Sequence, residues 1–194
     1  MAEFFGMCVS GDLAGVQAAL NADPALSGAL DQNLWSGVHH ATKHGHTDVL
    51  EALLGAGAAV DARTHHDSTA LHIAACQDRA AAAKVLLAHR CDLEARDNKK
   101  NTPLLRAAQH GTAAVLALLL EAGASTTCRN VDGQLAVDRA REGAHQNVLD
   151  LLTEHARSLV GTPQVACPCP PFQACECAPS PGAALPGAPQ VQTD

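Results

Sequence analysis

The sequence predicts an all-α protein built from stacked pairs of short helices, and two observations support this. The first is composition: 47% of the 194 residues are apolar, yet they include only three Phe, one Trp and no Tyr. A core of Ala and Leu suits closely packed helices, whereas sheets favour β-branched and aromatic residues. The second is an internal repeat of constant length, which is typical of a solenoid.

Three segments align without a gap at one constant spacing. They are WSGVHHATKHGHTDVLEALLGAGAAVDAR, STALHIAACQDRAAAAKVLLAHRCDLEAR and NTPLLRAAQHGTAAVLALLLEAGASTTCR, which begin at Trp35, Ser68 and Asn101. Pairs of leucines coincide at 53 and 54, 86 and 87, and 119 and 120, where they predict one continuous core. A fourth, weaker copy follows as GQLAVDRAREGAHQNVLDLLTEH. Three ungapped copies indicate a repeated structure.

Each unit contains the signals of two helices. A Ser or Thr near its start predicts an N-cap, because the hydroxyl accepts a free backbone N–H. In the third unit Pro103 follows, at the first helical position, where a missing N–H costs nothing. A second helix then has apolar residues at helical spacing, and Gly57 and Gly123 mark its end. The polar segment before the next unit, such as RDNKKN, is predicted to be an extended loop with a turn.

These units resemble the ankyrin repeat family, whose pattern is G-x-TPLH-x-AA-x-x-G-H followed by a V-x-x-LL helix and GA. NTPLLRAAQHG and STALHIAACQD are close to that pattern, and AGAAVDAR matches the end of a unit. The resemblance covers residues 1 to about 159. It implies an ankyrin-repeat solenoid with a degenerate N-terminal capping repeat at 1–30, repeats at 31–63, 64–96 and 97–129, and a C-terminal capping repeat at 130–159.

The second repeat departs from this pattern at its helix ends. It has Asp78 and Arg90 where its neighbours have Gly. A non-glycine residue held at positive φ costs on the order of 1 kcal/mol. We therefore expect this repeat to be distorted there, or to be the least stable of the middle three.

Four histidines fall within the short stretch HHATKHGH, from His39 to His46. In the ankyrin pattern His39 takes the last position of TPLH and His46 the histidine of GH, so the resemblance implies structural roles for both. His72 repeats the position of His39. His40 and His44 share one helix face at i, i+4 and could hold a metal, but no HExxH arrangement accompanies them. We expect the repeat to have placed most of these histidines, and we predict no cofactor.

The composition argues against several classes of protein. The net charge is −7 without a long like-charge run, unlike a nucleic-acid binder. The longest apolar run, 113–120, is far shorter than the ~20 residues of a membrane span, and MAEFFGMCVSGD does not resemble a secretory signal. No phosphate-binding loop, G-x-S-x-G or kinase signature indicates an enzyme. The scattered cysteines at 8, 76, 91 and 128 suggest buried thiols in a reducing compartment, the cytoplasm or the nucleus.

The resemblance implies a monomeric protein-interaction module that binds a protein partner through its loop fingers and the exposed side of the first helix in each repeat. Carried over by position, the candidate residues are Gln32, Asn33, Trp35, Lys43 and His44; His65, His66, Ser68, Cys76 and Gln77; Asn98, Lys99, Asn101, Gln109 and His110; and Asp132, Gln134 and Glu142. Trp35 is the only Trp of the chain. It either anchors the partner or folds back over the neighbouring helices.

Three arginines recur at the repeat spacing and end the three repeats: Arg63, Arg96 and Arg129. Stacked along the fingers with Lys99 and Lys100, they predict a positive stripe suited to an acidic segment of the partner. The alternative is that each arginine pairs with a carboxylate of the adjacent finger, such as Asp61, Glu94 or Asp97.

Residues 160–194 form a separate tail, which holds eight of the ten prolines and is predicted to be disordered. Within it, CPCPPFQACEC contains Cys167, Cys169, Cys175 and Cys177. Three interpretations remain open: the thiolates bind Zn²⁺ or Cu(I), the thiols are acylated and tether the protein to a membrane, or they do nothing specific. A metal- or thiol-handling protein that acts through this tail is therefore the alternative function.

Overall fold

The computed structural model describes residues 2–160, which form α-helices and one 3₁₀ helix. In chain order they are α1 (Ala2–Ser10), α2 (Leu13–Ala22), η1 (Pro24–Gly28), α3 (Gly37–His44), α4 (Thr47–Gly55), α5 (Ala70–Gln77), α6 (Ala80–Ala88), α7 (Pro103–His110), α8 (Ala113–Glu121), α9 (Ala136–Glu142) and α10 (Gln146–Val160). No strand is formed in this range, where one isolated bridge joins Leu30 and Ser36. The all-α prediction is confirmed.

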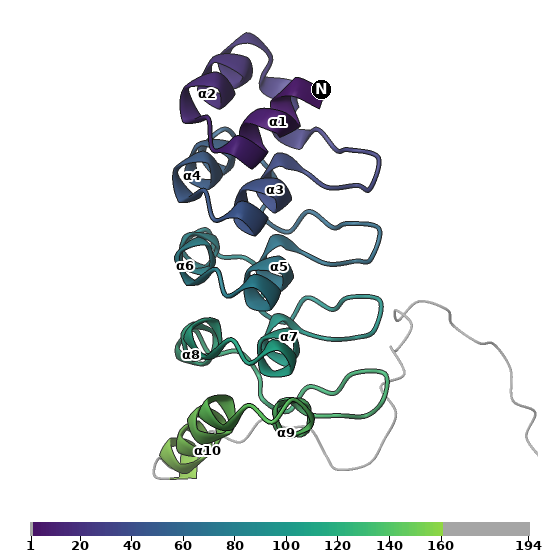
Figure 1. Cartoon of the computed structure of the whole chain (residues 1–194), viewed down its shortest axis with the longest axis vertical. Helices are drawn as coiled ribbons and strands as arrows, with labels where there is room; N and C mark the ends of the chain where they lie inside the picture. The colour runs from purple at the N-terminus through teal and green to yellow at the C-terminus, as the bar shows by residue number, and fades with distance from the viewer. Residues whose placement is uncertain (1, 161–194) are drawn as a thin grey trace, which may run out of the picture. The chain divides into compact units, whose positions relative to one another are not determined.

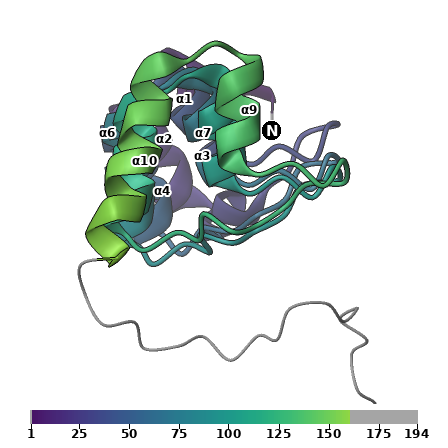
Figure 2. The same ribbon diagram turned by 90° about the horizontal axis from the view of Figure 1, so that it is seen from below.

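The helix pairs stack in one direction, with α1, α3, α5, α7 and α9 in an inner layer and the even-numbered helices in an outer layer (Figure 1). Each inner helix contacts the next inner helix, and α4, α6 and α8 do the same in the outer layer. The long loops between pairs project beside the inner helices as fingers that lie one above another (Figure 2). Equivalent positions of successive repeats therefore lie side by side.

The core runs through the whole stack. Leu53, Leu86 and Leu119 are fully buried members of one hydrophobic cluster, as the repeat predicts. Their neighbours differ slightly, since Leu54 and Leu120 are buried but Leu87 is only partly so. Among the described residues, no helix is sufficiently long and apolar to serve as a membrane span.

Histidines fix the starts of two inner helices and tie each to the next finger. The Nδ1 atom of His39 accepts the Ser36 backbone N–H at 3.0 Å, and its Nε2 donates to the Ala62 carbonyl at 3.0 Å. His72 accepts the equivalent Thr69 N–H in the second repeat, and its Nε2 donates to a different carbonyl further along the chain, that of Asn101. Burial lowers the pKa of His39 to about 4, so the ring stays neutral. The structural roles implied for these histidines are confirmed.

A second set of side chains joins each repeat to the one before it. They occupy the same position of successive repeats and donate to backbone carbonyls: His46 to Val9 at 2.9 Å, Arg79 to Lys43 at 3.1 Å, Thr112 to Ala75 at 2.7 Å and His145 to Gln109 at 3.1 Å. His46, for which the ankyrin pattern implies a structural role, thus also makes a hydrogen bond that joins two repeats. Three different residue types perform this task, because only a donor of the right reach is needed.

The left-handed helix ends fall where the sequence places them. Gly57 and Gly123 have φ of 87° and 89°, and Arg90 takes the equivalent position with φ of 57°. Asp78, at the end of α5, has φ of 51° where Gly45 has 80°. The second repeat therefore holds non-glycine residues in this conformation at both of its helix ends, where its neighbours have glycine, and the effect on its stability stays a prediction.

Candidate partner-binding surface

The candidate surface lies in the angle between the inner helices and the fingers, and we call it the groove. Because the repeat length is constant, each groove position recurs once per repeat as a row. Three rows matter here: Trp35, Ser68, Asn101 and Gln134; His40, Ile73, Arg106 and Arg139; and Lys43, Cys76, Gln109 and Glu142. Side chains of neighbouring repeats in one row are adjacent, so a change in one row alters the surface locally.

In the first repeat Asp31 organises the finger and holds a groove residue. Its Oδ1 accepts the backbone N–H groups of Asn33 at 2.7 Å and Trp35 at 2.8 Å. Its Oδ2 pairs with His40 Nε2 at 3.1 Å. His40 therefore has a carboxylate partner, and His44 stacks on the ring of His46. In the described part of the chain, no three His, Cys, Asp or Glu are grouped to hold a metal.

The third repeat has the same arrangement with stronger charges. Asp97 Oδ1 accepts the N–H groups of Lys99 at 2.9 Å and Asn101 at 2.8 Å, and Oδ2 accepts from Arg106 Nε at 2.8 Å. The side chain of Asp97 is fully buried, and that of Arg106 is 21% exposed. Asn101, predicted as a partner contact, is instead 2% exposed, and its amide donates to the same carboxylate. It braces the finger and offers no free surface.

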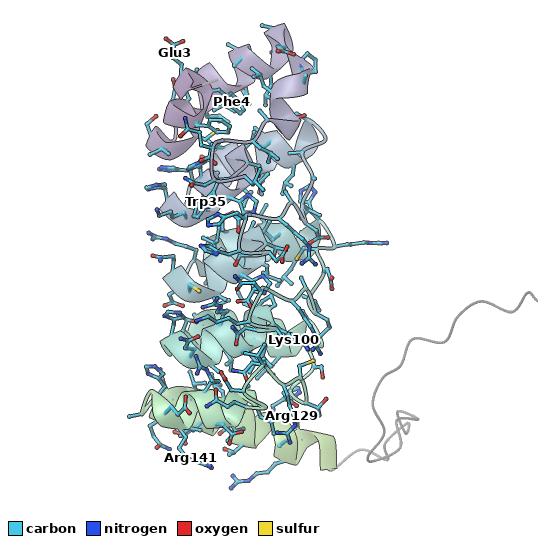
Figure 3. The ribbon with its side chains drawn as sticks, turned by 90° about the vertical axis from the view of Figure 1, so that its right-hand side faces the viewer. Glu3, Phe4, Trp35, Lys100, Arg129 and Arg141 are labelled. Carbon is cyan, nitrogen blue, oxygen red and sulfur yellow. The ribbon has the colours of Figure 1, made fainter. Side chains whose placement is uncertain are left out.

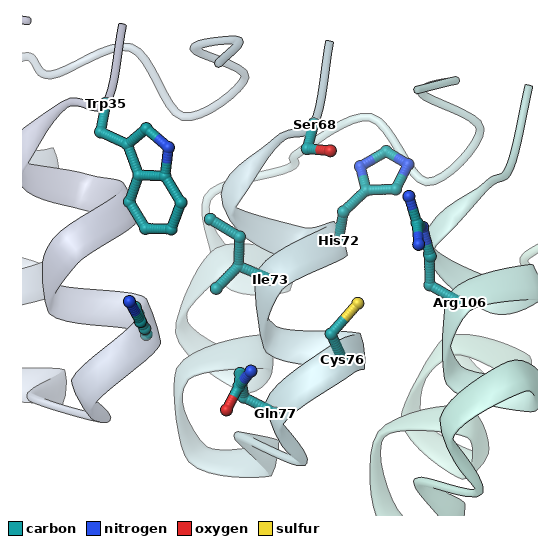
Figure 4. A pocket seen from close by; sticks show the side chains of 8 residues that line it. Trp35, Ser68, His72, Ile73, Cys76, Gln77 and Arg106 are labelled. Carbon is teal, nitrogen blue, oxygen red and sulfur yellow. The ribbon is translucent and has the colours of Figure 1, made fainter. Parts of the chain in front are cut away.

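The second repeat has no such ion pair. Thr64 replaces the aspartate and Ile73 replaces the imidazole of His40 or the guanidinium of Arg106, so this part of the groove lacks the pair. A pocket of about 170 Å³ opens here, lined by Trp35, Lys43, Ser68, His72, Ile73, Cys76, Gln77 and Arg106. Figure 4 shows Ile73 and Cys76 on the middle helix, with Trp35 on one side and Arg106 on the other.

Trp35 partly folds back and also lines this pocket. Its ring lies 5.3 Å from that of His40 and is half-buried. The ammonium of Lys43 stands 5.3 Å from the centre of the indole, at cation–π distance. The indole therefore packs against its own helix, as the fold-back alternative predicts, while its role as an anchor for a partner stays a prediction.

The arginine ladder lies on the fingers and does not line the pocket. Arg63 donates to the Arg96 carbonyl at 2.9 Å, Arg96 contacts the Cys128 sulfur at 3.7 Å, and Arg129 donates to the Gly133 carbonyl. Figure 3, which faces the fingers, shows Lys100 and Arg129 below Trp35. The predicted set of contact residues therefore divides into a groove and a stripe on the fingers.

No carboxylate within residues 2–160 lies at ion-pair distance from any of the three ladder arginines. The three candidate carboxylates have other partners: Asp61 accepts the Asp92 N–H, Glu94 accepts from Ser125 and Cys128, and Asp97 holds Arg106. The alternative in which each arginine pairs with these carboxylates is not seen in this geometry.

Eight of the other predicted residues fall into two exposed groups. Asn33, His65, His66, Asn98 and Lys99 stand at the finger tips, where carbonyls of one finger accept N–H groups of the next. The second group, at the far ends of the inner helices, comprises His44, Gln77 and His110. Burial and then neighbouring cations lower the pKa of His44 and of His110, which indicates positive surroundings at these ends.

Two residues central to the pocket, Ile73 and Arg106, were not among the predicted contacts. The sequence contained a signal for them: the row of His40, Ile73, Arg106 and Arg139 has one Ile among three ionisable residues. The tail cysteines Cys167, Cys169, Cys175 and Cys177 lie outside the described residues.

Comparisons with known proteins agree with this architecture. A family model for ankyrin repeats in three copies matches residues 4–97, and one for a single ankyrin repeat matches residues 99–131. The chain is similar to human Inversin (33% identity over 113 residues), human SH3 and multiple ankyrin repeat domains protein 2 (37% over 73) and human Ankyrin repeat and SOCS box protein 11 (32% over 111). These matches cover 58%, 38% and 57% of this chain but only 11%, 4% and 34% of the relatives.

Proposed function

Because the chain belongs to the ankyrin repeat family, a family of protein-interaction modules, we propose that it binds an acidic segment of a protein partner along the groove and the fingers. The observation that carries this proposal is a set of cationic side chains with no acidic partner of their own. Arg63, Arg96, Arg129 and Lys43 all lack an ion pair within the described residues. On a chain of net charge −7, such a local excess of cations favours and steers an anionic ligand.

A non-enzymatic role is supported by the state of the groove's thiol and its neighbouring imidazole. Burial raises the pKa of Cys76, so the thiol is protonated and a poor nucleophile. His72 precedes it by one helical turn on α5, but both of its ring nitrogens are used by the Thr69 N–H and the Asn101 carbonyl. His72 is therefore not free to act as a base towards this cysteine.

We place the protein in a reducing compartment, the cytoplasm or the nucleus. Cys8, Cys76, Cys91 and Cys128 are free. Burial raises the pKa of Cys8 to about 11 and that of Cys91 to about 12, so both behave as small apolar core residues. We propose that the repeat domain works as a monomer.

Affinity capture with charge-reversed variants tests the proposed function. The full chain retains its partner, and the variant Arg96→Glu with Arg129→Glu loses it, because the stripe then repels acidic groups. The matched control is Arg157→Glu on the exposed surface of α10, which leaves capture intact. Unchanged capture by the double variant would remove the acidic partner from the proposal.

The alternative function through the tail is distinguished by deletion of residues 161–194. If the repeats carry the function, capture survives the deletion. If capture disappears while thermal unfolding of the remaining chain is unchanged, the tail carries it and the proposal for the groove fails.

A further inference from the structure

The pocket in the second repeat owes its existence to one break in the groove. In the first and third repeats, a buried or half-buried aspartate pairs across the finger with His40 or Arg106. In the second repeat the same two positions hold Thr64 and Ile73. A site without the pair, between two sites that have it, follows from that substitution.

The dimensions and walls of the pocket fit one apolar side chain. An apolar cavity of roughly 150 Å³ holds a molecule the size of benzene, and this pocket measures about 170 Å³. The indole of Trp35, the side chain of Ile73 and the thiol of Cys76 form its walls. The volume is suited to a single Leu or Ile side chain.

The rim of the pocket offers hydrogen-bond donors and a positive charge. Lys43 has no ion-pair partner among the described residues. Within the same residues, the indole N–H of Trp35 and the side-chain amide of Gln77 make no hydrogen bonds. Arg106 is also at the rim, but Asp97 balances its charge. Among residues 2–160, no carboxylate lines the pocket. A partner group next to the inserted side chain is therefore favoured if it is an acceptor with negative charge.

We infer that the pocket takes one branched aliphatic side chain from the partner's acidic segment, with a carboxylate of that segment against Lys43. The inference rests on the proposed function and specifies it: the arginine stripe supplies general attraction to acidic segments, and the pocket selects those with Leu or Ile beside an acidic residue. Burying one such side chain contributes free energy that a charged stripe alone does not.

The chain offers two unique reporters for this inference. Ile73 is the only Ile and Trp35 the only Trp in the sequence, and they face the same pocket. In the full chain, one isoleucine δ1-methyl signal and one indole N–H signal therefore report on the pocket by NMR without ambiguity. The probe is a peptide selected from a display library with Leu fixed at its centre and Asp or Glu fixed nearby at varied spacing.

The expected result is that the selected peptide binds, shifts both signals, and binds at least about tenfold more weakly when its central Leu is changed to Ser. The decisive protein variant is Thr64→Asp with Ile73→Arg, which recreates in the second repeat the ion pair that the third repeat already contains. It fills the pocket and is expected to weaken binding by the same factor. Ile73→Ala serves as a second variant if the double variant unfolds, and it is expected to weaken binding severalfold.

The matched control introduces one Arg and one Asp elsewhere in the second repeat. Ala81→Arg with Ala88→Asp changes exposed positions of α6, in the outer layer, and leaves affinity unchanged. If the peptide or the captured partner binds but the Ile73 methyl does not shift and the double variant binds normally, the pocket inference is overturned while the proposed function stands. If neither the library nor affinity capture yields a ligand, the proposed function itself fails.

Discussion

The guanidinium of Arg106 lies against the fully buried carboxylate of Asp97, which also accepts the backbone N–H groups of Lys99 and Asn101. One carboxylate therefore shapes the finger of the third repeat and fixes a groove residue on α7. Burial acts to raise the pKa of Asp97, but hydrogen bonds from Asn101 and Arg106 and the charge of Arg106 outweigh it and hold the pKa below its usual value. The carboxylate is thus charged at neutral pH.

Removal of the cation should expose the cost of that buried charge. Arg106→Leu leaves the Asp97 carboxylate without its counter-ion, and we expect a loss of about 3–5 kcal/mol in the free energy of unfolding, measured with urea. Arg141→Leu is the matched control, since the pair with Asp138 is exposed and 3.9 Å long, and it should cost no more than about 1 kcal/mol. Equal losses in the two variants would show that Asp97 does not depend on Arg106.

The neutral His39 predicts how stability responds to pH. Its pKa of about 4 in the folded protein is below the ~6.5 of an unfolded chain, so between these values the unfolded state binds the proton and the folded state does not. The contribution of His39 to the free energy of unfolding is complete above about pH 6.5. It falls by on the order of 3 kcal/mol as the pH is lowered to 4.

His39→Leu isolates this contribution, because Leu105 occupies the equivalent position in the third repeat. The free energy of unfolding should fall less steeply between pH 6.5 and pH 4 in the variant than in the parent chain. Urea titrations at a series of pH values measure the difference. Parallel pH profiles would mean that His39 is protonated in the folded state.

The repeat itself was fully predictable, because its helices, caps and leucine core follow from residues that recur at one spacing. Leu53, Leu86 and Leu119 lie in one cluster, and His39 bridges to the next finger, as the pattern implies. The groove was less predictable. The family pattern marks which positions are free to vary, but it does not tell which of them bond to each other.

Asn101 and Ile73 illustrate this limit. Asn101 occupies a variable, polar position, and only the position of the Asp97 carboxylate decides that it is buried. Ile73 follows the helical pattern of a core residue, and it forms a pocket wall only because neighbouring repeats place Trp35 and Arg106 on either side. The first case depends on side-chain geometry within one finger, and the second on neighbours that are far apart in the sequence.

The central leucine of the core should couple the two halves of the stack. Leu86→Ala creates a cavity at a fully buried site, and we expect a loss of about 2–5 kcal/mol in the free energy of unfolding. Since each repeat contacts only its neighbours, the transition should also separate into two steps. The adjacent Leu87→Ala is the control, with a smaller loss and a single transition because Leu87 is only partly buried. A single, equally shifted transition in both variants would contradict the one-dimensional coupling.

The strained helix ends of the second repeat make it the expected weak point among the middle three. Arg90 and Asp78 have φ of 57° and 51°, whereas the equivalent residues of the neighbouring repeats are glycines. For an L-residue with a Cβ atom, this conformation costs on the order of 1 kcal/mol. Amide hydrogen exchange in residues 64–96 should therefore be faster than in 31–63 or 97–129.

Glycine at these positions should relieve the strain, although its greater freedom in the unfolded chain offsets part of the gain. We expect Arg90→Gly to raise the free energy of unfolding by roughly 0.5 kcal/mol and to slow exchange selectively in the second repeat. The reciprocal change Gly57→Arg in the first repeat is the control. It should speed exchange there through the backbone conformation, because no neighbouring atom lies within 4 Å of an added Cβ. If the second repeat exchanges slowest in the parent chain, the left-handed residues are not its weak point, and the stability of the stack is instead limited at its ends.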